Sequence, residues 1–74
     1  MKHAYRDNTV EFEDVSSFNE TEAALQVSIP EIEDGKLFWI PKSQISDASE
    51  IYRKNQIKGI LIISEWIARQ KEFI

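Results

Sequence analysis

The chain contains no cysteine and only one histidine, His3, among its 74 residues. Without cysteine there is no disulfide, no thiolate metal site and no thiol nucleophile. A general base has to be held within about 3 Å of the proton it removes, and a terminal histidine does not meet that condition. Gly35 and Gly59 are the only glycines, which excludes a glycine-rich phosphate loop. These absences predict a protein that is not an enzyme and that needs no cofactor.

Long apolar runs are also missing, since none exceeds four residues. A membrane-spanning helix needs about 20 apolar residues, and the polar start of the chain does not fit a signal peptide. We therefore expect no membrane partner. The lack of cysteine fits a reducing compartment and favours a cytoplasmic location.

What is present is typical of a small globular domain, with 42% hydrophobic and 30% charged residues. The length predicts a single domain, residues 1–74, in which residues 1–8 form a flexible N-terminus. A core of this size lies near the lower limit for independent folding, so a homodimer remains open as a further source of stability.

The most prominent stretch has four consecutive bulky apolar side chains, which follow the turn signal Asp34-Gly35. A continuous apolar run is typical of a strand that is buried on both faces. The sequence therefore predicts a central strand over residues 36–41, covered on both sides, with Leu37 and Trp39 sharing one of its faces.

Alternating apolar and polar residues predict two further strands before this one. The first covers residues 9–15, and a turn over residues 16–21 separates it from the second, residues 22–29. The acidic connection that follows ends in Asp34-Gly35, so the second strand and the central strand are expected to form an antiparallel hairpin.

The part of the chain after the central strand is less uniform. Residues 43–56 form either a short helix capped by Ser46 or Asp47, or a loop with one 3₁₀ turn. A last strand is expected over residues 56–63, with Ile57 facing the core. Gly59 marks a bend or bulge in that strand.

The C-terminal residues 64–74 predict a helix with Ser64 as its N-cap. Its apolar face comprises Trp66, Ile67, Phe73 and Ile74, and we expect Trp66 to cover the outer side of the central strand. The elements together predict a mainly β (α+β) fold. It is a small curved antiparallel sheet, or an SH3-like barrel, of three to five strands with one C-terminal helix packed on it.

Charge is unevenly distributed along the sequence. The net charge is −4, but residues 1–35 carry two basic and nine acidic residues, whereas residues 36–74 carry seven basic and four acidic ones. The two halves either neutralise each other across strand pairs or form separate faces that steer partners of opposite sign. On the second interpretation, a partner-binding acidic face comprises Glu11, Glu13, Glu31, Glu33 and Asp34. The spacing of these carboxylates matches no calcium loop, so no metal site is predicted.

A single-stranded nucleic acid is the alternative partner. Small β-barrels bind such strands by stacking bases on exposed aromatic residues beside basic side chains. The candidate residues are Trp39, Lys42, Arg53 and Lys54. A pI near 4.9 weakens this alternative, because the overall charge repels phosphate.

Residues 34–45 read DGKLFWIPKSQI, and residues 64–68 read SEWIA. Over residues 22–72 the chain resembles small uncharacterised proteins of phages and bacterial mobile elements, in which a DGxxxWIPKSxI segment precedes an EWLA-type helix. The resemblance implies an accessory protein of a phage or mobile element that acts in a bacterial cytoplasm, with inhibition of a host protein as one outcome. Together with the absences above, it favours a non-enzymatic interaction module that binds a bacterial host protein.

Overall fold

The computed structural model describes residues 4–5 and 8–74 of the chain, with side chains from residue 8 onward. His3 and most of the expected flexible N-terminus lie outside these residues. Within that N-terminus, Ala4–Tyr5 form a short strand, β1, which pairs with the next strand.

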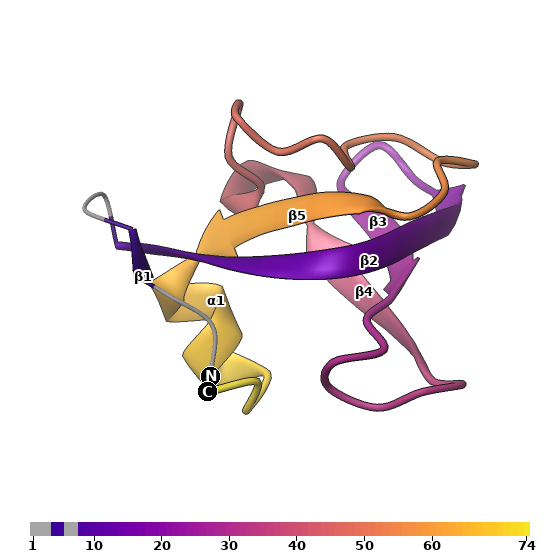
Figure 1. Ribbon diagram of the computed structural model, residues 1–74. Helices are drawn as coiled ribbons and strands as arrows, with labels where there is room; N and C mark the ends of the chain where they lie inside the picture. Colours follow the sequence, from indigo (N-terminus) through magenta and orange to yellow (C-terminus); the bar gives the residue numbers. More distant parts are fainter. Residues whose placement is uncertain (1–3, 6–7) are drawn as a thin grey trace.

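Four longer strands and two short helices follow β1 (Figure 1). They are β2 (Thr9–Glu20), β3 (Ala24–Ser28), β4 (Leu37–Pro41), the 3₁₀ helix η1 (Lys42–Gln44), β5 (Gly59–Ser64) and α1 (Glu65–Gln70). The sheet is antiparallel, its strand order is β1-β2-β3-β4, and β5 pairs with β2. A mainly β fold with one C-terminal helix packed on a small sheet is therefore confirmed.

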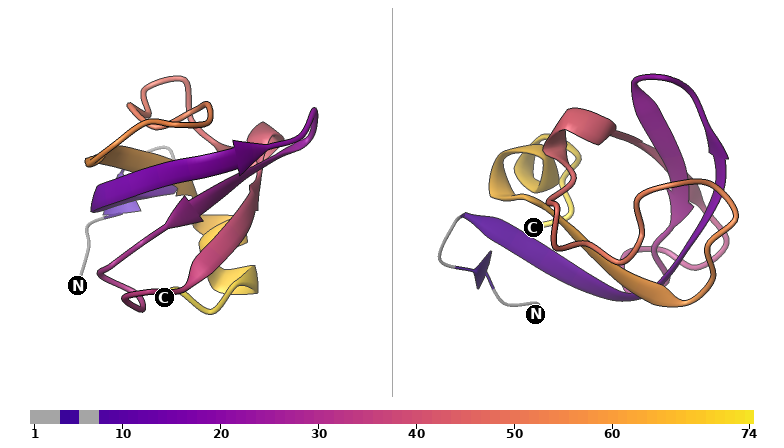
Figure 2. Two further views of the ribbon diagram at one scale, coloured as in Figure 1. Left: turned by 90° about the vertical axis from the view of Figure 1, so that its right-hand side faces the viewer. Right: turned by 90° about the horizontal axis from the view of Figure 1, so that it is seen from above.

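The long strand β2 joins the two parts of this sheet. Its first half pairs with β1 and β5, and its second half pairs with β3. Seen from above, the strands curve around the core and α1 occupies one side (Figure 2). The sheet does not close into a barrel, because β4 and β5 do not pair with each other, and an isolated bridge joins Ile63 of β5 to Ile45, which follows η1.

The core lies on the concave side of the sheet. Its buried side chains come from β2, β3, β4, β5, α1 and the connecting segments: Val10, Phe12, Val15, Leu25, Val27, Ile29, Ile40, Ile51, Leu61, Ile63, Ile67, Ala68 and Phe73. Alternation along the strands accounts for most of this set, since neighbouring strand residues point to opposite faces.

The predicted turn over residues 16–21 is wrong for most of its length, because β2 continues to Glu20. Ser17 is buried and its hydroxyl donates to the carbonyl oxygen of Arg53 at 2.5 Å. The same hydroxyl accepts the N–H of Gln56 at 2.9 Å. Partners more than 35 positions away in the sequence thus replace the local bonds that favour serine in turns.

The central strand and its hairpin are confirmed, since β4 pairs with β3 from Ala24↔Pro41 to Ser28↔Leu37. The turn before it places Gly35 at φ +84°, a conformation that glycine adopts without steric cost. The prediction that β4 is covered on both faces is wrong. Leu37 and Trp39 are 45% and 41% exposed, and only the opposite face, with Ile40 fully buried, contributes to the core.

The C-terminal helix begins as predicted, because the Ser64 hydroxyl accepts the N–H of Ile67 at 3.1 Å. Its predicted apolar face is only partly correct, since Trp66 is 58% exposed and Ile74 is also exposed. Ile67, Ala68 and Phe73 are the buried side chains of this segment.

The error at Trp66 has a geometric cause. The helix ends at Gln70, and Glu72 adopts a positive φ of 62°, so Phe73 is not on a continuous helical face with Trp66. The Phe73 ring instead packs edge-on against Phe12 and Phe38, with ring centroids 5.8 Å and 4.9 Å apart. The small side chain of Ala68 is the one that is fully buried on this helix, and the indole of Trp66 remains outside the core.

Between β4 and β5 the chain forms η1 and then a long loop, so of the two alternatives for residues 43–56 the loop with a 3₁₀ turn is correct. The last strand starts later than predicted, and Ile57 lies before it with 78% of its surface exposed. A Cβ on Gly59 would lie 2.7 Å from Cδ1 of Ile51, so this glycine permits a close contact.

A bulge does lie beside Gly59, but its extra residue belongs to β2. Phe12 pairs with Leu61 and Val15 pairs with Gly59, which leaves two residues of β2 opposite one of β5. Asp14 occupies this bulge with a positive φ of 58°.

Candidate functional site

Three of the five predicted acidic residues belong to the connection between β3 and β4. Glu31, Glu33 and Asp34 are all exposed in this segment, which we call the acidic loop. Glu13, in the bulge of β2, lies beside it, because its backbone N–H donates to Oε1 of Glu31 at 2.8 Å. Residues 18 positions apart in the sequence thus come together at one end of the sheet.

Local bonds fix the shape of the acidic loop. The N–H groups of Ile32 and Glu33 both donate to the carbonyl oxygen of Ile29, at 2.9 Å and 3.1 Å. The Ile32 side chain is partly buried against the core, so the loop is anchored from its middle. The residues on either side of Ile32, Glu31 and Glu33, are consequently exposed at the surface.

Two features modify the predicted acidic face. Glu11 is only partly exposed, and it lies before the bulge on β2, so it extends the acidic surface along the strand rather than joining the loop. Lys36 approaches Glu33 with 3.9 Å between Nζ and Oε1. Both side chains of that pair are more than half exposed, so the ion pair contributes little to stability. Three carboxylates against one ammonium leave the loop with a net negative charge.

The alternative residues for nucleic-acid binding come from β4, from η1 and from the loop before β5. Trp39 lies on the convex side of β4, whereas Lys42 follows the strand and forms an ion pair with Glu20, with 2.6 Å between Nζ and Oε2. The other carboxylate oxygen of Glu20 accepts the backbone N–H of Lys54 at 2.7 Å. The guanidinium of Arg53 lies 5.6 Å from the ring centroid of Tyr52.

Glu20 therefore sits among the cations that were expected to attract phosphate. The hydrogen bond from Lys42, followed by that from the Lys54 backbone, lowers the pKa of Glu20 below its ordinary value of 4.5. The carboxylate remains charged at neutral pH and compensates Lys42. This ion pair joins the acidic half of the sequence to the basic half, although Lys42 lies in η1 rather than in a paired strand.

The convex side of β2, β3 and β4 carries an uncharged surface that the sequence did not predict as a site. Gln26 pairs with Trp39 and Ser28 with Leu37, so these four side chains share one face. Phe18, in the irregular part of β2 opposite Gln26, is 43% exposed. We call Phe18, Gln26, Ser28, Leu37 and Trp39 the outer face.

Phe18 could not be assigned to this surface from the sequence, because it was placed in a turn. Val15 and Ser17 are buried on one side of β2 and Phe18 lies on the other, which is the alternation of a strand. The sequence does not reveal this alternation, because a serine is not expected at a buried position. Asn19 completes the irregular step, since its side-chain amide donates to Oε1 of Gln26 at 2.8 Å.

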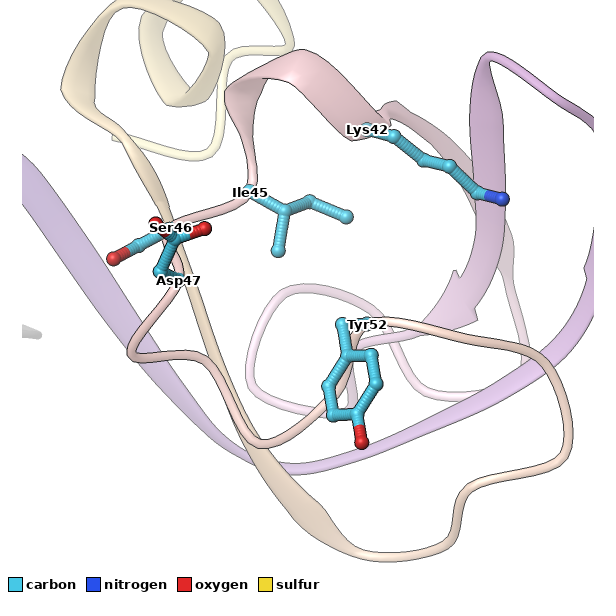
Figure 3. Close-up of a pocket in the computed structure, with 5 residues that line it drawn as sticks. All are labelled: Lys42, Ile45, Ser46, Asp47 and Tyr52. Atoms are coloured by element: carbon cyan, nitrogen blue, oxygen red, sulfur yellow. The ribbon is translucent and has the colours of Figure 1, made fainter.

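A pocket of about 290 Å³ opens at the other end of the molecule (Figure 3). It is lined by Lys42, Ile45, Ser46, Asp47 and Tyr52. The Lys42 side chain extends away from the other four residues in this view, in keeping with its ion pair to Glu20. No two of these five lining residues are hydrogen-bonded to each other as a nucleophile and its base, and the charges of the pocket are one paired ammonium and one exposed carboxylate.

Two further features concern metal binding and membrane insertion. Among the residues that the structure describes, no three potential metal ligands of the His, Cys, Asp and Glu types cluster together. In the same part of the chain, the only α-helix is far too short to cross a bilayer.

Comparisons with known proteins add no assignment. The chain matches no protein-family model, and neither a curated protein sequence nor a solved structure matches it significantly.

Proposed function

We propose that the protein is a non-enzymatic interaction module that binds a basic surface of another protein through its acidic loop and the adjoining Glu13. The observation that carries this proposal is the bond between the Glu13 backbone and the Glu31 carboxylate. It holds acidic side chains from β2 and from the β3–β4 connection in one region. The Ile32 anchor supports the proposal further, because a loop tied to the core loses little conformational entropy on binding.

An excess of negative charge at one end of a small domain has a kinetic use. It accelerates the encounter with a partner of opposite charge and rejects partners of the same charge. The resemblance to small phage and mobile-element proteins supports a bacterial host protein in the cytoplasm as the partner. A module of this kind acts as an inhibitor when its target surface is one that the host protein needs for its own function.

A pull-down from bacterial lysate tests this proposal, with the variant Glu31→Lys/Glu33→Lys compared with the wild-type chain. Glu22→Lys is a matched control, because Glu22 is equally exposed but lies in the β2–β3 turn at the opposite end of β3. We expect the double variant to lose a protein that the wild type and the control both retain, provided that all three have the same melting temperature. Equal recovery of every protein by all three baits would contradict the proposal.

Single-stranded nucleic acid remains a second candidate, favoured by the exposure of Trp39 and Phe18 on neighbouring parts of one sheet. The ion pair between Glu20 and Lys42 weighs against it. Fluorescence anisotropy with a labelled single-stranded oligonucleotide at low salt discriminates the two. Binding that Trp39→Ala and Lys42→Glu both weaken would favour the nucleic acid over a protein partner.

A further inference from the structure

The outer face is exposed, largely apolar and without charge. Phe18, Leu37 and Trp39 are each more than 40% exposed, and the residues beside them on the same face are uncharged. In a chain with 30% charged residues, an uncharged patch of this kind on β3, β4 and the end of β2 is not the expected solvent-facing composition.

The acidic loop borders this face at one end. Leu37 begins β4 directly after the loop, and its cross-strand neighbour Ser28 ends β3 directly before it. At the other end, Glu20 and Lys42 form an ion pair. The surface is therefore apolar in the middle, with an excess of carboxylates at one edge and paired charges at the other.

We infer that the outer face is a docking site for a protein segment that places apolar side chains on Phe18, Leu37 and Trp39 and Lys or Arg against the acidic loop. This inference rests on the proposed function and extends it. It names the apolar contact and says that the partner segment carries apolar residues next to basic ones. Charge complementarity selects the occupant. A nucleic-acid strand would bring its phosphates beside Glu31, Glu33 and Asp34, whereas a segment with basic residues at that edge gains from them.

The energetic centre of this site is Trp39. It lies in the middle of β4, between Leu37 and the end of the strand, and it has Gln26 as its cross-strand neighbour. Exposed tryptophans that become buried on binding are typical hot spots, and a further hydrogen-bonding group beside them fixes the orientation of the partner.

Site-specific photocrosslinking in bacterial cells tests the inference with the full chain. A photoreactive benzoylphenylalanine replaces Leu37 or Trp39, and in a matched control it replaces Trp66, an indole on α1 that is more exposed than Trp39. We expect protein adducts from positions 37 and 39 and none from position 66. The cross-linked partner peptide, sequenced by mass spectrometry, should contain apolar residues flanked by Lys or Arg.

Other adducts would overturn the inference. A nuclease-sensitive adduct would show that the partner is a nucleic acid, and an adduct of the chain with itself would show that it is a second copy.

The variant Glu31→Lys/Glu33→Lys separates the two proposals. If it loses the partner in a pull-down while positions 37 and 39 give no adducts in the wild type, the outer face is refuted and the proposed function stands. If adducts at position 39 survive the charge reversal undiminished, the role of the acidic loop is refuted, and with it the basic flank of the partner. Trp39→Ala should weaken binding to the captured protein about tenfold or more.

Discussion

The two tryptophans illustrate how a single residue's role depends on the chain around it. Both lie outside the core, but Trp39 is on a broad uncharged sheet face, whereas Trp66 projects from a helix of six residues. Helical periodicity predicted a buried Trp66 because it assumed that the helix continues to Phe73. The positive φ at Glu72 breaks that periodicity, and no local sequence signal reveals it.

Trp66→Ala should therefore change the free energy of unfolding by less than about 0.5 kcal/mol, as is usual for surface substitutions. Ile67→Ala, at the next position, should cost about 2–5 kcal/mol, because Ile67 is 95% buried against the sheet and leaves a cavity. Urea unfolding of the two variants measures both values. A larger loss of unfolding free energy for Trp66→Ala than for Ile67→Ala would mean that α1 packs on the sheet through its Trp66 face.

Acid titration probes a second residue, Glu20. Its pKa is lowered in the folded protein, mainly by Lys42, so its contribution to stability is present above pH 4.5 and is lost as the pH falls through the lowered value. In Glu20→Gln this part of the pH dependence should disappear. The thermal midpoint measured from pH 7 to pH 2 in both proteins gives the comparison, and parallel curves would argue against the ion pair.

At the scale of elements, β5 and the loop before it are fitted together at Gly59. Gly59→Ala should destabilise the protein by about 1–3 kcal/mol, because the new Cβ would stand 2.7 Å from Cδ1 of the buried Ile51. The cost should be smaller in an Ile51→Val background, which lacks that atom. Chemical denaturation of the four proteins closes this double-mutant cycle, and a cost independent of residue 51 would place the strain elsewhere.

The elements that could be predicted are those whose signal is local. The hairpin of β3 and β4 follows from alternation and from Asp34-Gly35, and the start of α1 follows from Ser64. The second half of β2 could not be predicted, because Ser17 is buried only by virtue of bonds to Arg53 and Gln56. Long-range partners decide the state of such a residue, and periodicity does not contain them.

For the molecule as a whole, the same distinction separates the two candidate surfaces. The three carboxylates of the acidic loop are close in sequence, so their clustering could be predicted. The hydrogen bond that joins the Glu13 backbone to Glu31 could not be predicted. The outer face could not be predicted. It forms only because β2 is long enough to include Phe18 and because one side of β4 is exposed. The prediction of a doubly covered β4 concealed this uncharged surface.

We propose that the acidic loop and the outer face act as one continuous protein-binding surface. Amide hydrogen exchange of the chain, measured alone and bound to the protein it captures, reports on this surface residue by residue. We expect slower exchange in residues 31–39 on binding, with no change in the loop of residues 52–58. Protection confined to residues 52–58, with residues 31–39 exchanging as in the free chain, would contradict it.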